Sequence, residues 1–153
     1  MSSEPSRIET SPTEPRTATG VAPRYSRYLA GYLALTVVGT IGLLVLAKRS
    51  SHLLAAVEVL VAGGVLAAAS VGAIAALYRD AVGLAEAGTR WNPDWKPYVA
   101  FAVGTPVAVY LAIAYVTVSD VALLAAGVAF VGAAFEAAAL YLYRRFEYVG
   151  TPA

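Results

Sequence analysis

The sequence predicts an all-α polytopic membrane protein, a four-transmembrane-helix bundle built from two antiparallel hairpins. Hydrophobic residues make up 59% of the chain and charged residues only 14%, whereas soluble domains average about 25% charged. Four continuous apolar runs follow one another, and each is long enough to cross a hydrocarbon core of about 30 Å. The strands of an outer-membrane barrel are excluded, because they alternate apolar and polar residues over about ten positions.

The chain opens with residues 1–27, which are rich in Ser, Thr, Pro, Glu and Arg and are predicted to be a disordered tail. The first span follows over about 28–47 and ends at Lys48 and Arg49. A signal peptide has an apolar core of only about 7–15 residues after a short charged region. The long polar tail and the longer run therefore favour an uncleaved membrane helix.

The second span, about 53–78, is interrupted only by Glu58 and Ser70. Its many Ala and Gly residues allow close approach of membrane helices. The third span, about 98–118, contains Pro106, which is expected to kink it.

The fourth span is predicted over about 121–143, and a tail follows over 144–153. Arg144 and Arg145 are expected to stop this helix.

A polar bridge, residues 79–97, joins the two hairpins. Residues 78–87 have helix-forming composition, and Gly88 suits the left-handed position after a helix, so the second helix should extend about two turns into the bridge. The aromatic residues of the bridge are predicted to anchor the chain at the membrane interface, with a docking loop for a cytosolic partner as the alternative. These anchors are Trp91, Trp95 and Tyr98.

Positive charges predict the orientation. With four spans, both tails and the bridge lie on one side, which holds nine cations, while the opposite side holds only Lys48 and Arg49. The positive-inside rule then places both termini and the bridge in the cytoplasm of a plasma-membrane protein. The nine are Arg7, Arg16, Arg24, Arg27, Arg79, Arg90, Lys96, Arg144 and Arg145.

Two acids within the spans, Glu58 and Glu136, are the first functional candidates, because a charge at the centre of a membrane helix costs about 2.5–3.5 kcal/mol. At 100° per residue, both lie on faces made mostly of small residues, so both are expected to face the bundle interior. The helical rise separates them by roughly 15 Å along the membrane normal, which is too far for a shared proton.

Each acid has polar candidates at its own depth. Tyr115 is level with Glu58, which Lys48 or Arg49 could also reach, and Ser70, Thr105 and Tyr32 are level with Glu136. One hypothesis is a proton or cation relay that steps between the two acids. The other, which is favoured, is that the acids are hydrogen-bonded to neighbouring helices and fix their register.

Other chemistry finds little support in the sequence. The chain has no cysteine and a single histidine, His52, which excludes disulfides, thiolate chemistry and a multi-histidine metal site within one chain. A Gly-rich phosphate loop is absent, and the net charge of +1 carries no nucleic-acid signature. We therefore expect no enzymatic activity, no cofactor and no nucleic-acid partner.

A short sequence pattern, which we call the echo, recurs weakly at the end of each hairpin. Its two copies are Ala76-Leu77-Tyr78-Arg79 and Tyr141-Leu142-Tyr143-Arg144. It would fit a duplicated hairpin, as in transporters with parallel repeats. The favoured alternative is that a tyrosine followed by an arginine is simply typical of a cytoplasmic helix end.

The motif Tyr78-Arg79-Asp80-Ala81, followed by Trp91-Asn92-Pro93, resembles small, uncharacterised four-span integral membrane proteins of halophilic archaea. The polar tail and the Ala/Val/Gly-rich spans are similar too, although such proteins usually carry more acid outside the membrane. The resemblance covers the last three spans and implies no particular activity.

The sequence thus predicts an integral membrane protein with a structural or accessory role. Its expected partners are the lipid bilayer and either further copies of the chain or another membrane protein. The alternative function is a small proton- or cation-coupled transporter that uses Glu58 and Glu136. It resembles four-helix multidrug exporters in size, but it lacks their glutamate in the first span.

Overall fold

A computed structural model describes residues 24–49, 52–89 and 91–149 of the 153-residue chain. The described residues form α-helices and no strands, so the predicted all-α four-helix fold is confirmed. The predicted disordered tail lies outside the described residues up to residue 23. The four helices are α1 (Arg24–Arg49), α2 (His52–Glu86), α3 (Lys96–Ala114) and α4 (Ser119–Val149).

The helix ends follow from local chemistry. α2 runs to Glu86, and Gly88 then adopts φ 62°, as its position after the helix predicts. The backbone N–H of Lys96 donates to Asp94 Oδ1 at 3.1 Å, and Pro97 occupies the first turn of α3, where its missing N–H is harmless. Pro106 lies inside α3, which continues past it to Ala114.

Three helices differ from their predicted bounds, and α3 ends at Ala114 and not near residue 118. α1 begins at Arg24 and not at residue 28, so the last residues assigned to the tail are helical. α4 continues to Val149, and the prediction that Arg144 and Arg145 stop it is wrong. Apolar composition marks where a helix leaves hydrocarbon, whereas the helix itself continues as long as its backbone hydrogen bonds are favourable.

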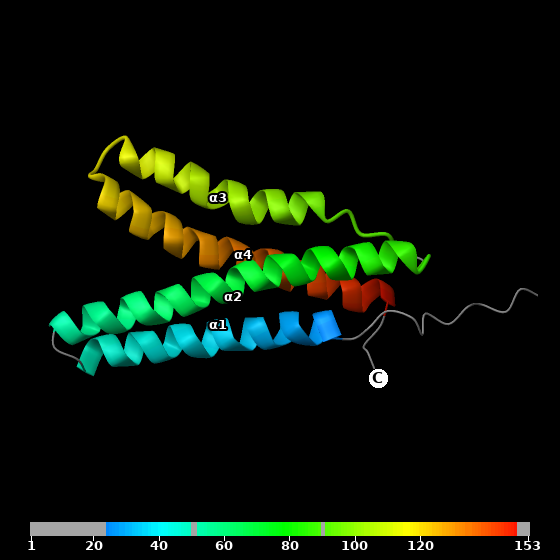
Figure 1. Ribbon diagram of the computed structural model, residues 1–153, viewed down its shortest axis with the longest axis horizontal. Helices are drawn as coiled ribbons and strands as arrows, with labels where there is room; N and C mark the ends of the chain where they lie inside the picture. Colours follow the sequence, from blue (N-terminus) through cyan, green and yellow to red (C-terminus); the bar gives the residue numbers. More distant parts are fainter. Residues whose placement is uncertain (1–23, 50–51, 90, 150–153) are drawn as a thin grey trace, which may run out of the picture.

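The helices form two hairpins, α1–α2 and α3–α4, as Figure 1 shows. We call the end that holds the α2–α3 connection the bridge end, and the end that holds the α1–α2 and α3–α4 connections the turn end. The hairpins overlap at the bridge end and diverge toward the turn end, where α3 and α4 lie well away from α1 and α2 (Figure 1).

The buried core lies from the middle of the helices to the bridge end, with Leu66 and Ala122 as the outlying members. Small residues of α2 and α4 dominate it, and large side chains from α1, α3 and the two long helices fill the space between them. The core cluster consists of Leu29, Tyr32, Ala73, Ala76, Leu77, Ala81, Tyr98, Ala102, Ala134, Ala137, Ala138, Tyr141 and Leu142.

All four helices are long and apolar enough to cross a membrane, with spans of 19 to 31 residues and mean hydropathy from 1.7 to 2.2. Large aliphatic side chains are exposed along their outer faces, for example Val38, Leu60 and Leu123. Such continuous apolar surface is typical of lipid contact and not of a soluble bundle. The protein is therefore a multi-pass membrane protein.

Candidate functional site

The most deeply buried charges of the described residues lie where α2 and α4 meet at the bridge end. Asp80 is 1% exposed and Arg145 is 3% exposed. Asp80 Oδ2 accepts a hydrogen bond from Arg145 Nε at 2.9 Å and another from the Tyr141 hydroxyl at 2.8 Å. We call these three residues the clamp, because they join one hairpin to the other.

The two helix extensions create the clamp. Asp80 lies in the part of α2 that extends beyond Tyr78, and Arg145 lies beyond Tyr143 in α4. Tyr141 and Arg145 are four residues apart, so they share one face of α4 and reach the same carboxylate. A buried charge is tolerated only with a counter-charge and hydrogen bonds, and Asp80 has both at Oδ2.

Asp80 Oδ1 differs from Oδ2. It is buried and has no hydrogen-bond partner among the described residues. The carboxylate therefore makes both of its contacts through one oxygen, an arrangement that leaves the second oxygen with an unmet desolvation cost.

Aromatic side chains from the bridge and α3 enclose the clamp. The Tyr98 ring meets the Tyr141 ring edge to face at 5.6 Å, and the Trp91 ring lies against Tyr141 at 5.5 Å. Trp91 also stacks on Tyr148, with centroids 5.9 Å apart and planes 16° apart. The bridge is thus packed onto the last turns of α4, and this packing keeps water away from the ion pair.

The two candidate acids lie apart from the clamp. Glu58 is half-buried on α2, in the half of the helix nearer the turn end. Glu136 is exposed on α4, so the expectation that it faces the interior is wrong. Within the described ranges no hydrogen bond or ion pair involves Glu136. Its carboxylate opens into a groove of about 420 Å³ between α3 and α4, lined by Pro97, Tyr98, Phe101, Glu136, Ala137, Leu140 and Arg144.

The polar residues expected near the acids have other roles. Ser70 is fully buried and shares a hydrogen bond of 2.9 Å with the Tyr32 hydroxyl, which joins α2 to α1. Ser70 also donates to the Leu66 carbonyl at 2.8 Å. Thr105 is half-buried on α3, and Tyr115 is 92% exposed at the end of α3. The structure therefore does not gather these side chains around either acid.

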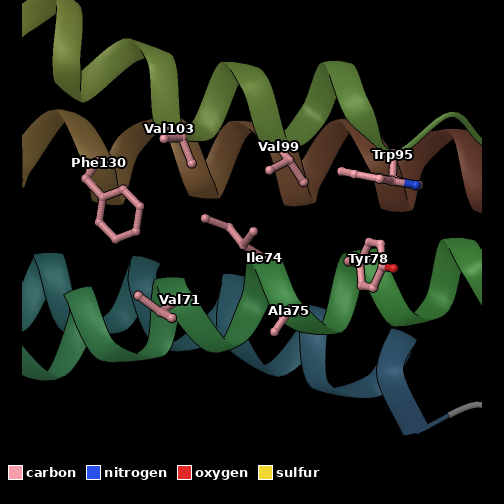
Figure 2. Close-up of a pocket in the computed structure, with 8 residues that line it drawn as sticks. All are labelled: Val71, Ile74, Ala75, Tyr78, Trp95, Val99, Val103 and Phe130. Carbon is pink, nitrogen blue, oxygen red and sulfur yellow. The ribbon is translucent and has the colours of Figure 1, made fainter.

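A second groove, of about 540 Å³, separates α2 from α3. Figure 2 shows Ile74 and Tyr78 of α2 facing α3 across the gap, with Phe130 of α4 beside them. The groove ends at the bridge end, where the Tyr78 and Trp95 rings meet edge to face at 4.9 Å. Its lining is apolar and aromatic: Val71, Ile74, Ala75, Tyr78, Trp95, Val99, Val103 and Phe130.

The clamp is the site that sequence reasoning missed, although one signal pointed to it. In the echo that closes both hairpins, the residue after Arg79 is Asp80 and the residue after Arg144 is Arg145. These equivalent positions pair with each other, 65 residues apart in the chain. The five positions that begin at Ala76 and at Tyr141 also share one pattern: two buried, two exposed and one buried.

Comparison with models of known protein families, with curated proteins and with solved structures finds no match for this chain.

Proposed function

We propose that the protein is a non-enzymatic structural or accessory component of the plasma membrane, with both termini and the bridge in the cytoplasm. The clamp is the observation that carries this proposal. Its ionisable groups are buried, paired and enclosed by aromatic rings, which suits a joint between helices. A catalytic or transport group instead needs access to its substrate or to water.

The grooves support the same conclusion. The lining of the α2–α3 groove is apolar and aromatic, and it contains no charged side chain. The α3–α4 groove holds Glu136 but not Glu58, and neither groove is lined by both acids. A relay through the two acids would need a continuous polar path. Tyr32 and Ser70, which the helical rise predicts to be level with Glu136, are instead hydrogen-bonded to each other in the core.

Reconstitution in sealed vesicles tests this proposal against proton- or cation-coupled transport. We expect that an imposed pH gradient or potassium potential decays at the same rate with the protein as with empty vesicles. Glu58→Gln and Glu136→Gln should leave both that rate and the helical circular dichroism unchanged, as should the matched control Glu147→Gln, an exposed acid near the end of α4. A protein-dependent flux that either substitution abolishes in a folded protein would establish the transporter instead.

The assembly state tests the accessory role directly. Membranes that contain the protein are extracted into native nanodiscs, and the mass of the purified particle is measured. An accessory component should be found with further copies of the chain or with another membrane protein, at a protein mass well above the 15.9 kDa of one chain. Particles that hold a single chain alone would contradict the proposal.

A further inference from the structure

The α2–α3 groove is open toward the membrane, and the side chains that line it leave a space between them. Figure 2 shows Ile74 and Tyr78 of α2 facing Val99 and Trp95 of α3, and only the pair at the bridge end is in aromatic contact. If this groove of about 540 Å³ were empty, the side chains along both walls would lack dispersion contacts on one side. In a bilayer, hydrocarbon therefore fills it.

The shape of the groove selects the kind of hydrocarbon. A partner helix with its side chains is about 10–12 Å across. Such a helix cannot continue past the bridge end, because Tyr78 and Trp95 close the groove there with ring centroids 4.9 Å apart. A single acyl chain is much thinner, and it can end below these rings while its headgroup lies at the surface. The geometry thus favours a lipid over a helix of a second copy.

The charges at the closed end select the headgroup. Tyr78 and Trp95 have the amphipathic rings that prefer headgroup depth, and the residue after each is an exposed cation, Arg79 and Lys96. The acid nearest to Lys96 in sequence, Asp94, accepts a hydrogen bond from the backbone N–H of Lys96. The acid nearest to Arg79, Asp80, is buried and paired with Arg145. Cations at this depth attract anionic lipids.

We propose that the α2–α3 groove binds one acyl chain of an anionic phospholipid, whose phosphate lies beside Arg79 and Lys96. The lipid comes from the leaflet at the bridge end, and its chain lies along Ile74, Val99 and Val103. This binding site goes beyond the accessory role and does not depend on it, because an accessory protein and a transporter could equally carry a bound lipid.

Fluorescence quenching tests the site, because the chain has only two tryptophans. In Trp91→Phe, Trp95 is the sole reporter and lines the groove. The variant is reconstituted in vesicles with phospholipids that carry brominated acyl chains, either phosphatidylglycerol or phosphatidylcholine, each over the same series of mole fractions. We expect the anionic lipid to quench Trp95 at lower mole fraction. Arg79→Gln and Lys96→Gln should each lower this preference about fivefold, the factor for about 1 kcal/mol per cation.

A second variant tests the position of the acyl chain. Ala75→Phe places a ring inside the groove and should weaken quenching by both lipids, whereas Ala68→Phe, on an exposed position of the same helix outside the groove, should not. The proposal is overturned if both lipids quench Trp95 equally and Ala75→Phe does not change this quenching. That result would mean that ordinary annular lipid contacts Trp95. Quenching that appears only after dilution of the protein in excess lipid would mean that a second copy covers the groove, which also overturns it. Should Ala75→Phe fail to fold, the two charge variants still decide the outcome.

Discussion

At the scale of single residues, Asp80 is the most deeply buried charged side chain among the described residues. A buried carboxylate loses the solvation of water, and here two hydrogen bonds to Oδ2 compensate for that loss only in part, because Oδ1 has no partner among the described residues. Arg145 is in the same position, because its charge is compensated by Asp80 alone among the described acids. Each partner therefore depends on the other, and removing one leaves the other buried without a counter-charge.

We predict that Asp80→Asn lowers the free energy of unfolding by about 3–5 kcal/mol, because Arg145 then stays buried and unpaired. Titration with sodium dodecyl sulfate in mixed micelles, followed by circular dichroism, measures the change. Glu86→Gln, an exposed acid of the same helix, is the matched control and should behave like the wild type.

The double variant Asp80→Leu/Arg145→Met sharpens this prediction. It removes both charges together and should recover most of the stability lost in Asp80→Asn, since well-packed apolar residues can replace a buried ion pair. A double variant as unstable as the single one would show that the charges themselves are not the cause.

Sequence reasoning predicted little of this site, and the reason is physical. Arg145 follows the apolar run of the fourth span, where a cation is usually solvated, and its partner is 65 residues away in the chain. Local composition contains no information on such a pairing. By contrast, Gly88 was predictable, because its left-handed conformation follows from the local end of α2.

At the scale of secondary-structure elements, hydrophobic patterning predicted the four helices but not all of their ends and not their contacts. Membrane helices pack through small residues, and the sequence holds so many Ala and Gly residues that nearly every face qualifies. Glu136 illustrates the problem: its face is rich in Ala, yet the side chain is exposed. Gly72 of α2, on the face of Glu58, does meet another helix, because the Tyr28 hydroxyl of α1 lies directly over it.

We predict that Gly72→Leu weakens the α1–α2 hairpin, with a loss of about 1–3 kcal/mol in the same titration, because the new side chain collides with the Tyr28 hydroxyl. Tyr28→Ala should relieve the collision and restore much of the stability. Gly64→Leu is the control on the same helix, since no atom outside the neighbouring backbone of α2 lies within 4 Å of a Cβ added there. Equal losses at Gly72 and Gly64 would argue against the close approach.

At the scale of the whole molecule, the hairpins are joined at one end only. The core, the clamp and the aromatic contacts of the bridge all lie toward the bridge end, and Figure 1 shows the hairpins apart at the turn end. Since the chain has no cysteine, spin labels can be placed at any pair of positions without background.

We predict a longer label distance between Val57 and Leu123, exposed near the turn end, than between Arg79 and Arg144, exposed at the bridge end. Double electron–electron resonance on the two cysteine pairs in nanodiscs measures both distances. Matching distances would mean that the hairpins close into a parallel-sided bundle in the membrane.

The orientation is also a property of the whole molecule. We predict that Lys96→Cys reacts with a membrane-impermeant maleimide only after intact cells are opened, because nine of the eleven cations are assigned to the cytoplasmic side. Lys48→Cys, exposed at the turn end, should react in intact cells. The reverse pattern of labelling would place the bridge outside the cell.

The position of the clamp also bears on how the protein is made. Asp80 is synthesised 65 residues before Arg145, so the first hairpin enters the membrane while its carboxylate still has no partner. We expect the pair to close, and the aromatic bridge to fold over it, only after the last turns of α4 have left the ribosome. A nascent chain arrested after α3 should therefore be degraded faster than the finished chain in a pulse–chase experiment, and Asp80→Leu should slow its loss. The ion pair would then also serve as a check that synthesis is complete.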